Sequence, residues 1–484
     1  MNVLFASSEV WPLVKTGGLG DVAYSLPKAL EAQGQDVKII VPAYREVLKS
    51  CTDLKILGWM DSPYGTQVSS IRLIEAQHPQ FDTPVWLVDC QGLFDRVGNP
   101  YVNSEGNDWA DNAERFTQFC WAVSQIATGQ VLPDWRADVV HANDWQCGLI
   151  PAFLDTHDHR PKRIFTIHNL AFGGHFSQQS FQSLRLPEAW WSPEGVEFYG
   201  GFSMLKAGLV YSDAITTVSP TYAKEICTSA FGYGMDGILS SRSYKLSGIL
   251  NGIDEKIWDP ADDNHLSHHY SAKNIQPGKL NNKRALLSDY LEDVSKETLA
   301  APLFGMVTRL TEQKGVDLIT QAIPVMLKQS DANFVLMGSG SAYYERIIQN
   351  LRDQYPSRVF CYLGYSETMA HRVEAGSDIF LMPSRYEPCG LNQMYSLRYG
   401  TLPLVTNTGG LADTVIDSSP ENIASGEANG FVMPLSDTKT LLTTMHRAVD
   451  LYGDQSIWSN IQKTAMNGDF SWKISAERYL SLYQ

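Results

Sequence analysis

The chain has 484 residues, 44% of them hydrophobic, which is enough to bury the cores of two or three domains. Its 53 Asp and Glu residues outnumber its 38 Lys and Arg residues, and the formal net charge is -15. This charge argues against binding to nucleic acid or to an anionic membrane surface, so a phosphate site must gather a few cations locally.

Short apolar runs alternate with segments of helical periodicity in the first half of the chain. Near-continuous apolar runs are typical of parallel strands that are buried on both faces. The first helix is predicted over residues 21–33, where Val22, Leu26 and Leu30 recur at helical spacing and Gly34 follows as a stop. The strands predicted in this half are residues 3–6, 37–41, 85–88, 139–141, 164–168 and 215–218.

The second half repeats the alternation. This pattern predicts an α/β protein with two doubly wound, Rossmann-like domains. Because sheets of this kind bind ligands at the carboxyl ends of their strands, the two domains can face each other across a central cleft. The predicted strands are residues 303–308, 334–337, 359–363, 379–382 and 402–405, and the predicted helices are residues 316–328, 343–354, 367–375, 391–399 and 411–416.

The domain boundary is predicted near residues 240–250, because an apolar run ends there and a polar stretch, residues 259–282, follows. The N-terminal domain is then residues 1–245 and the C-terminal domain is residues 246–465. The sequence gives no prediction of oligomeric state.

Seven cysteines are scattered without a C-x-x-C pair, and no basic leader precedes the first apolar run. Free thiols in a reducing cytoplasm are therefore expected. No two Asp residues are separated by a single residue, so the metal–diphosphate clamp of many sugar transferases is not expected.

The phrase Thr-Gly-Gly-Leu occurs near each end of the chain, at residues 16–19 and 408–411. Each pair of glycines precedes a predicted helix. Backbone N–H groups can approach a ligand closely at glycine, and a helix N-terminus adds partial positive charge. The two phrases predict two loops that hold a phosphate or the hydroxyls beside it, although two unrelated turns would give the same pattern.

Two cations follow a predicted strand of the second half. Arg309 and Lys314 are separated by one short turn, so both can reach a single diphosphate, Arg with a bidentate fork and Lys as a point charge. The alternative is an ordinary solvated pair.

Glu387 begins a tight turn, Glu-Pro-Cys-Gly-Leu, that leads into a predicted helix. A carboxylate there can accept hydrogen bonds from sugar hydroxyls or support positive charge at an anomeric carbon. The alternative is a helix cap.

His168 ends one predicted strand of the first half, and Asp144 comes shortly after another. Their position at the carboxyl end of a strand favours a role at the site. A packed and hydrogen-bonded core histidine would leave the same pattern at His168.

Together these segments resemble the family of bacterial glycogen synthases and plant starch synthases. The matching phrases come in the family's order along nearly the whole chain, at residues 15–21, 166–170, 218–223, 233–237, 250–254, 309–315, 383–391 and 408–413. The family usually has His where this chain has Asn143 and Gln146, and Tyr-Gln where it has Phe172-Gly173. In the family these positions are on the side that binds the acceptor.

The resemblance implies a GT-B fold whose last helix, residues 466–484, packs back onto the first domain. It implies transfer of glucose from ADP-glucose to the non-reducing end of an α-1,4-glucan, with retained configuration and with no metal or other cofactor. UDP-sugar transferases or epimerases of similar fold, or a non-catalytic glucan-binding scaffold, are the alternatives. The presence of Arg309, Lys314 and Glu387 argues against a scaffold.

The resemblance also implies roles for individual residues. Arg309 and Lys314 hold the donor diphosphate, Glu387 contacts the donor glucose, and His168 presents its backbone carbonyl and its ring near the sugar. The remaining substrate contacts that it implies are Lys15, Gly17, Gly18, Asp21, Asp144, Asn169, Asn251, Cys389, Gly390, Leu391, Thr408, Gly409 and Gly410.

Overall fold

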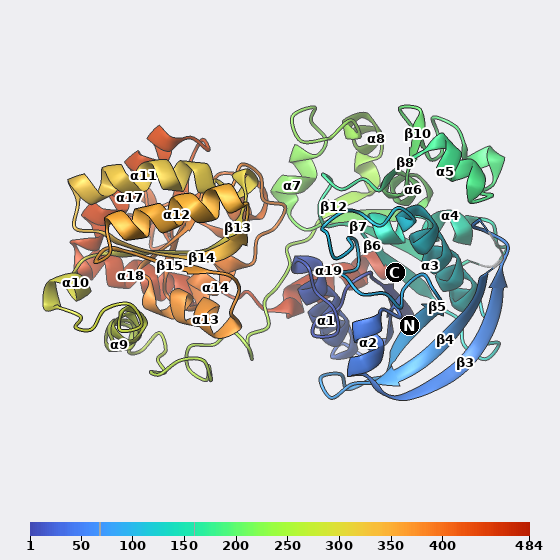
Figure 1. The fold of residues 1–484 in the computed structure, drawn as a ribbon, viewed down its shortest axis with the longest axis horizontal. Coiled ribbons are helices and arrows are strands. Elements are labelled where there is room, and N and C mark those ends of the chain that lie inside the picture. Colours follow the sequence, from blue (N-terminus) through green and yellow to red (C-terminus); the bar gives the residue numbers. More distant parts are fainter. Residues whose placement is uncertain (67–68, 159) are drawn as a thin grey trace. The chain divides into compact units, whose positions relative to one another are not determined.

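The computed structural model describes residues 1–66, 69–158 and 160–484, which form two compact units (Figure 1). The first unit is Met1–Asn251 with Trp472–Gln484, and the second is Gly252–Ser471. The predicted boundaries, after residue 245 and after residue 465, therefore both come too early. Residues 246–248 form a strand in the sheet of the first unit, and Ala465 still packs in the core of the second.

The sheet of the first unit is doubly wound around its first strand. β1 (Asn2–Ala6) lies between β2 (Asp36–Pro42) and β6 (Val139–Asn143) and is parallel to both. The strand order is β12-β11-β7-β6-β1-β2-β5-β4-β3. All six strands predicted in this half are present, and the others that match a prediction are β5 (Val85–Cys90), β7 (Lys162–Ile167) and β11 (Ala214–Thr217).

The sequence did not indicate the antiparallel part of this sheet. β3 (Thr52–Ser62) and β4 (Ser69–Gln77) form a hairpin at one edge. β3 is exposed along most of its length, Leu54, Ile56 and Trp59 included, so the short apolar run at residues 56–60 does not mark a strand that is buried on both faces. Also unpredicted are β12 (Leu246–Gly248) and a small separate sheet of β8 (His175–Ser177), β10 (Gly201–Ser203) and β9 (Glu197–Phe198).

α1 (Gly18–Glu31) starts at the first glycine phrase, three residues before the predicted start at Asp21, and buries Leu19, Val22, Leu26 and Leu30. The last helix, α19 (Trp472–Tyr483), packs against α1 and belongs to the first unit. The Tyr483 hydroxyl lies 2.7 Å from His141 Nδ1, so a buried hydrogen bond ties this helix to the sheet. The helix was expected from residue 466, but α18 occupies the chain up to that point.

Further helices of the first unit surround the sheet (Figure 1). They are α2 (Arg45–Ser50), α3 (Asn112–Ala127), α4 (Ile150–Asp155), α5 (Gln178–Ser183), α6 (Met204–Tyr211), α7 (Pro220–Glu225) and α8 (Asp236–Ser241).

The second unit has a parallel sheet in the order β15-β14-β13-β16-β17-β18. All five strands predicted here are present, and β18 was not predicted. The strands are β13 (Leu303–Leu310), β14 (Asn333–Gly340), β15 (Val359–Leu363), β16 (Ile379–Met382), β17 (Leu402–Thr406) and β18 (Phe431–Met433).

Helices cover both faces of this sheet. Phe304 and Met306 of β13 pack with the helices α11, α12 and α17, whereas Leu303 packs with α9 and α13 on the other face (Figure 1). The helices of the unit are α9 (Ile275–Leu287), α10 (Lys296–Ala300), α11 (Val316–Gln329), α12 (Ala342–Gln354), α13 (Glu367–Gly376), α14 (Asn392–Arg398), α15 (Gly409–Thr414), α16 (Pro420–Ser425), α17 (Thr438–Tyr452) and α18 (Gln455–Met466).

Within the described residues, no helix combines the length and the apolar character that crossing a lipid bilayer requires.

Candidate active site

The strand order of the second unit reverses direction beside β13. From β13 the chain moves outward to β14 and β15, then returns to β16 on the other side of β13 and continues to β17 and β18. Ligands of open α/β sheets bind at the carboxyl ends of the strands beside such a switch point. The ends of β13, β16 and β17, with the loops that follow them, carry Arg309, Lys314, Glu387, Cys389, Gly390, Leu391, Thr408, Gly409 and Gly410.

Lys314 and Glu387 form an ion pair at this switch point. Lys314 Nζ lies 2.5 Å from Glu387 Oε2, and the Ser384 hydroxyl donates to the same oxygen at 3.1 Å. The Lys314 side chain is 18% exposed and the Glu387 side chain 9% exposed. A largely desolvated cation and carboxylate in contact form a strong local field at the end of β13 and β16.

Hydrogen bonds fasten the loop after β13 to the loop after β16. Gln313 Nε2 donates to the Tyr386 carbonyl at 2.6 Å, and the Arg385 amide donates to the Gln313 carbonyl at 2.9 Å. The Arg385 guanidinium also donates hydrogen bonds to both carboxylate oxygens of Asp317, at 2.8 and 2.7 Å. This hydrogen bonding lowers the pKa of Asp317. The ion pair of Lys314 and Glu387 therefore rests on a rigid support.

Arg309 lies near the end of β13 with its side chain exposed. Across the described part of the chain, its guanidinium makes no hydrogen bond or ion pair, in contrast to Lys314. Its backbone carbonyl accepts from the Thr311 amide at 2.9 Å, which fixes the turn toward Lys314. The guanidinium is thus available to an anionic ligand.

The second glycine phrase does not have the geometry that the sequence suggested. The Gly410 amide donates to the carbonyls of Glu387 and Pro388, each at 3.2 Å, rather than facing an open site. A Cβ on Gly410 would lie 2.1 Å from the Cys389 carbonyl oxygen, and one on Gly409 (φ +45°) would lie 1.9 Å from that of Glu387. The glycines therefore let the loop after β17 pack directly against the loop that carries Glu387.

The turn after Glu387 is held from both sides. Gly390 has φ +73°, and Gln393 Nε2 donates to the carbonyls of Cys389 and Gly390, both at 3.1 Å. α14 begins at Asn392, one residue later than predicted, with Leu391 as its N-cap residue. Cys389 is buried, and Thr408 is the buried N-cap residue of α15.

In the first unit, the first glycine phrase is held by a residue that the sequence analysis missed. Glu9 is 3% exposed, and its Oε2 accepts from the amides of Thr16 (2.5 Å) and Gly17 (3.2 Å). Its Oε1 accepts from the Thr16 hydroxyl (2.6 Å) and the Tyr101 hydroxyl (2.5 Å). The available signal was an acidic residue three positions after an apolar strand and before the glycines.

The rest of this loop is open. A Cβ on Gly17 would meet no atom within 4 Å, so packing does not require glycine there. Gly18 begins α1, and Lys15 Nζ pairs with Asp21 Oδ1 at 2.8 Å, with both side chains partly exposed. The loop thus presents a cation, a carboxylate and a helix start to solvent.

Asp144, His168 and Asn169 lie together at the ends of β6 and β7. Asp144 Oδ1 accepts from the amides of His168 (2.9 Å) and Asn169 (3.4 Å), and Asp144 has φ +59°. Burial outweighs these hydrogen bonds and raises the pKa of Asp144 to about 7, with the nearby charge of Glu9 adding to the shift. The two loops of this unit therefore influence each other electrostatically.

The unusual Asn143 sets the tautomer of His168. Asn143 Nδ2 donates to the Ala6 carbonyl at 3.0 Å, so its Oδ1 faces His168 Nε2, also at 3.0 Å. Nε2 is then the protonated nitrogen. Burial lowers the pKa of His168 to about 3, so the ring is neutral at pH 7.

Asn251 is the last residue of the first unit and is 7% exposed. Its side-chain Oδ1 has no hydrogen-bond partner among the described residues. A buried acceptor of this kind is rare in folded proteins and is consistent with a contact that a ligand supplies.

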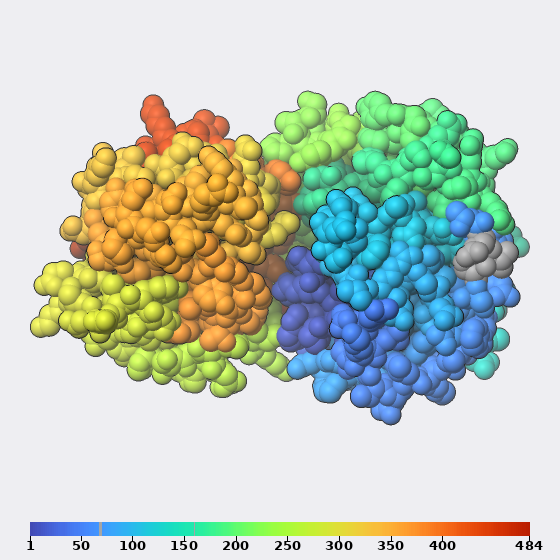
Figure 2. Space-filling view, in the orientation of Figure 1, coloured from blue at the N-terminus to red at the C-terminus, as the bar shows by residue number. Residues whose placement is uncertain are grey.

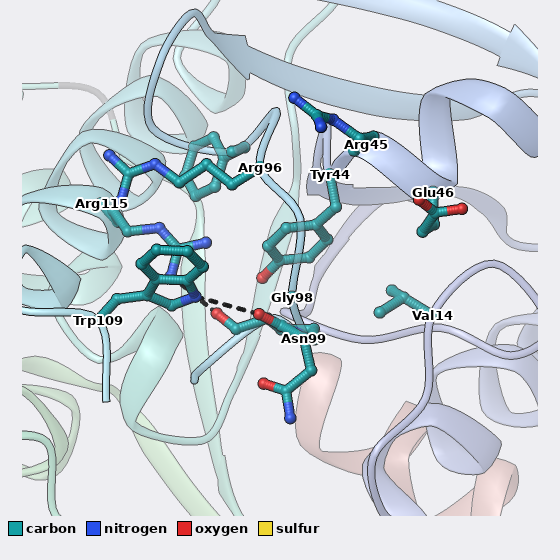
Figure 3. A pocket seen from close by; sticks show the side chains of 11 residues that line it. Val14, Tyr44, Arg45, Glu46, Arg96, Gly98, Asn99, Trp109 and Arg115 are labelled. Atoms are coloured by element: carbon teal, nitrogen blue, oxygen red, sulfur yellow. Dashed lines mark hydrogen bonds between the residues drawn. The ribbon is translucent and has the colours of Figure 1, made fainter. Parts of the chain in front are cut away.

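A cavity of about 40 Å³ near the first glycine loop is a different feature (Figure 3). Val14, Tyr44, Arg96 and Arg115 help to line it, and Trp109 Nε1 donates to a neighbouring backbone carbonyl at 3.2 Å. Pockets that hold small-molecule ligands usually measure about 300–1,000 Å³. This cavity is too small for a nucleotide sugar and belongs to the packing around the loop.

Two family models match the chain. The starch synthase catalytic domain matches residues 2–241, and glycosyl transferases group 1 matches residues 292–461. The glycogen synthase of Thioalkalivibrio sulfidiphilus is 46% identical over 484 residues, which is 100% of this chain and 99% of that protein. The glycogen synthase of Cellvibrio japonicus is 47% identical over 490 residues, 100% of this chain and 98% of that protein.

The chain belongs to the glycogen synthase and starch synthase family. Its fold resembles the catalytic domain of starch synthase IV from Arabidopsis thaliana, bound to ADP and acarbose, with a TM-score of 0.87 and 32% identity over 100% of this chain and 98% of that one. Sucrose-phosphate synthase from Thermosynechococcus elongatus shares the fold, with a TM-score of 0.62 and 16% identity over the same shares of the two chains. The two Rossmann-like units are those of a GT-B glucosyltransferase, as the sequence predicted.

Proposed function

We propose that this glycogen synthase family member transfers glucose from ADP-glucose to the non-reducing end of an α-1,4-glucan, with retained configuration and without a metal ion. The observation that carries the proposal is the ion pair of Lys314 and Glu387 at the switch point of the second unit, with the exposed Arg309 at the end of β13, five residues before Lys314. The presence of ADP in the related starch synthase IV structure supports a nucleoside diphosphate as the leaving group.

Arg309 and Lys314 act on the leaving diphosphate. Negative charge accumulates there as the bond between the anomeric carbon and the phosphate oxygen breaks. Fixed cations that need no reorganisation stabilise such charge strongly. Lys314 then shares its donors between the phosphate and Glu387, so Glu387 also sets the orientation of the ammonium group.

Glu387 acts on the donor sugar. Its carboxylate, fixed by Lys314 and the Ser384 hydroxyl, can accept hydrogen bonds from glucose hydroxyls and favours positive charge at the anomeric carbon. His168, neutral at pH 7, contributes its ring and its backbone carbonyl as uncharged polar groups.

Retention follows from attack on the face that the diphosphate leaves. The acceptor hydroxyl oxygen bonds to the anomeric carbon while the carbon–phosphate-oxygen bond breaks, and the hydroxyl proton passes to the leaving phosphate oxygen. No residue forms a covalent bond to glucose in this step. Trapping a glucosyl group on any carboxylate of the protein would contradict it.

The experiment is a transfer assay with radiolabelled donor and glycogen as acceptor. We expect incorporation from ADP-glucose to exceed incorporation from UDP-glucose, and treatment with EDTA to leave it unchanged. Preference for UDP-glucose would overturn the proposed donor. Activity that depends on a divalent cation would overturn the proposal that no metal is needed. Binding to glycogen without transfer from either donor would favour the scaffold alternative.

We also propose a cytoplasmic location. No disulfide joins the seven cysteines, all of which lie within the described residues, as is usual in a reducing compartment. Finding the native protein in a periplasmic or secreted fraction would contradict this.

A further inference from the structure

Two tyrosines in the first unit adopt a backbone conformation that tyrosine rarely takes. Tyr199 has φ +48° and is followed by Gly200 at φ +81°, and Tyr233 has φ +50° and is followed by Gly234 at φ +80°. Glycine enters this left-handed region freely, whereas a bulky side chain there is strained. Strain of this kind persists where the surroundings impose it, and it is concentrated at functional sites.

The two Tyr-Gly turns meet. A Cβ on Gly234 would lie 3.2 Å from Tyr199 Cε2 and 3.3 Å from Phe198 Cζ, so the Gly234 backbone rests on both rings. Despite this support, the Tyr199 side chain is 83% exposed. The left-handed turns thus hold a large aromatic ring at the surface rather than hiding it.

Neighbouring rings continue this surface. The Phe198 ring meets the Tyr199 ring edge to face, with centroids 4.7 Å apart, and stacks on the His175 ring at 5.0 Å and an interplanar angle of 16°. Phe198 is in β9 and His175 is in β8, and both strands pair with β10. The Gly200 amide donates to Glu197 Oε1 at 2.7 Å, which closes the turn after Tyr199. The row of rings is therefore built on a small sheet rather than on a free loop.

The row is continuous with the candidate site of this unit. The Phe172 amide donates to the carbonyl of Asn169, a predicted site residue, at 3.2 Å, and Phe172 is itself 55% exposed. The Gly173 carbonyl accepts from the Ser203 hydroxyl at 2.6 Å, which joins this segment to the end of β10. The region of β8, β10 and α5 is coloured green at the surface of the first unit in Figure 2.

We propose that Tyr199, Phe198 and His175 form an aromatic platform that binds the glucan acceptor by stacking against its sugar rings. The proposal rests on the proposed function, because a neutral glucan is the ligand that the family's activity supplies. A pyranose ring has an apolar C–H face and polar edges, which suits a flat ring that carries a polar hydroxyl. A stable protein partner would need about 800 Å² from each side, and three rings in a row offer a much smaller surface.

The test compares Tyr199→Asn with a matched control, Tyr244→Asn. Asn tolerates the left-handed region, so removing the ring relieves strain and the fold is kept. Tyr244 is equally exposed, at 84%, and lies in the same unit without positive φ. The readouts are retardation of each protein in native gels that contain glycogen, and the KM for glycogen and for ADP-glucose.

We expect Tyr199→Asn to weaken glycogen binding and raise the KM for glycogen about 5- to 10-fold, the size of one lost aromatic contact. We expect the turnover number and the KM for ADP-glucose to stay at the wild-type level. The melting temperature should stay the same or rise. Tyr199→Phe, which keeps the ring, should restore most of the binding, and Tyr244→Asn should match the wild type.

Glycogen retardation of Tyr199→Asn equal to that of Tyr244→Asn would overturn the platform. So would a change in oligomeric state without a change in glycogen binding, because the surface would then be a protein contact. The gel measures binding without any donor. A wild-type protein that is retarded by glycogen but transfers nothing from ADP-glucose would therefore refute the proposed function and leave the platform standing.

Discussion

Lys314 Nζ and Glu387 Oε2 lie 2.5 Å apart, although 73 positions separate the two residues in the chain. The contact exists because β13 and β16 are neighbours in the sheet and the loops after them are joined through Gln313 and Arg385. Its ammonium group neutralises a nearly buried carboxylate, and we propose for it a second role at the donor diphosphate. For Arg309 we propose only the diphosphate role.

Lys314→Ala and Arg309→Ala should therefore differ in stability and agree in catalysis. Each should lower turnover about 10²- to 10³-fold, the usual effect of removing one group that stabilises transition-state charge. Only Lys314→Ala leaves a buried carboxylate without its cation, which is strongly destabilising, so only this variant should melt at a clearly lower temperature. The measurements are initial rates with ADP-glucose and thermal melting, with Lys439→Ala, an exposed lysine of the same unit, as control. Turnover near the wild-type level in both variants would remove the diphosphate role.

The two glycine phrases look alike in the sequence and should respond differently to substitution. Gly410→Ala places a Cβ 2.1 Å from the Cys389 carbonyl oxygen, in contact with backbone that cannot move aside. Such overpacking costs about 1–3 kcal/mol and should shift the turn of Glu387, so both stability and turnover fall. In Gly17→Ala the added Cβ meets no atom within 4 Å, and the φ of residue 17, -156°, suits alanine. The free energy of unfolding of this variant should therefore stay within about 0.5 kcal/mol of the wild type. Equal melting temperatures for the two variants would refute the assignment of the second pair to packing.

These glycines also show where sequence reasoning stopped. The Gly-Gly-Leu pattern located both loops correctly, because a turn before a helix has a local signature. Whether the amides face solvent or a neighbouring carbonyl depends on how the loops after β16 and β17 approach each other, which no local pattern encodes. Glu9 was missed for the same reason, since its hydrogen bonds to the loop are set by the folded turn after β1.

The predicted strands were confirmed where they are buried on both faces, because burial leaves a continuous apolar run. Elements with mixed surroundings left no such run. α9 lies partly in the polar stretch of residues 259–282, for which no helix was predicted, and it buries Lys279 and Lys283. Lys283 pairs with Asp378 at 2.7 Å, so its charge is compensated by a strand neighbour far along the chain. The lysines of such a helix are predicted to be exposed when only the sequence is known, because lysine is rarely buried.

Glu9 should be a positioning residue for the first glycine loop. Glu9→Gln keeps the size of the side chain but removes one carboxylate oxygen from a site where Thr16 and Gly17 both donate amides. Hydrogen bonds to a charged group contribute about 1.5–3 kcal/mol each, so we expect kcat/KM for ADP-glucose to fall about 10- to 100-fold. The exposed Glu477→Gln is the control. A purely structural role would lower the melting temperature of Glu9→Gln and leave the kinetic constants of the folded fraction unchanged.

A buried histidine in the second unit should make stability depend on pH. Burial by itself lowers the pKa of His371, but the hydrogen bond to Asp263, with Nδ1 and Oδ2 2.7 Å apart, and the carboxylate of Glu367, 3.5 Å from Nε2, outweigh it and raise the pKa above 6.5. Burial raises the pKa of Asp263, and its bonds to His371 and Tyr399 outweigh that effect and hold it below 3.8. The Trp258 ring stacks on the imidazole with centroids 3.8 Å apart, which further suits a cation.

The sign follows from linkage. The contribution of His371 is complete below its unfolded pKa of 6.5 and is lost as the pH rises through the higher folded value. The contribution of Asp263 is complete above 3.8 and is lost as the pH falls through its lower folded value. The pair therefore stabilises the folded protein most between the two unfolded-state pKa values, 3.8 and 6.5. In melting scans from about pH 5 to about pH 9, the wild type should lose more stability toward alkaline pH than His371→Gln does, while the control His446→Gln, at a half-buried histidine of the same unit, should follow the wild type. A His371→Gln profile parallel to that of the wild type would show that the imidazole is neutral in the folded protein and that the Asp263 contact is an ordinary hydrogen bond.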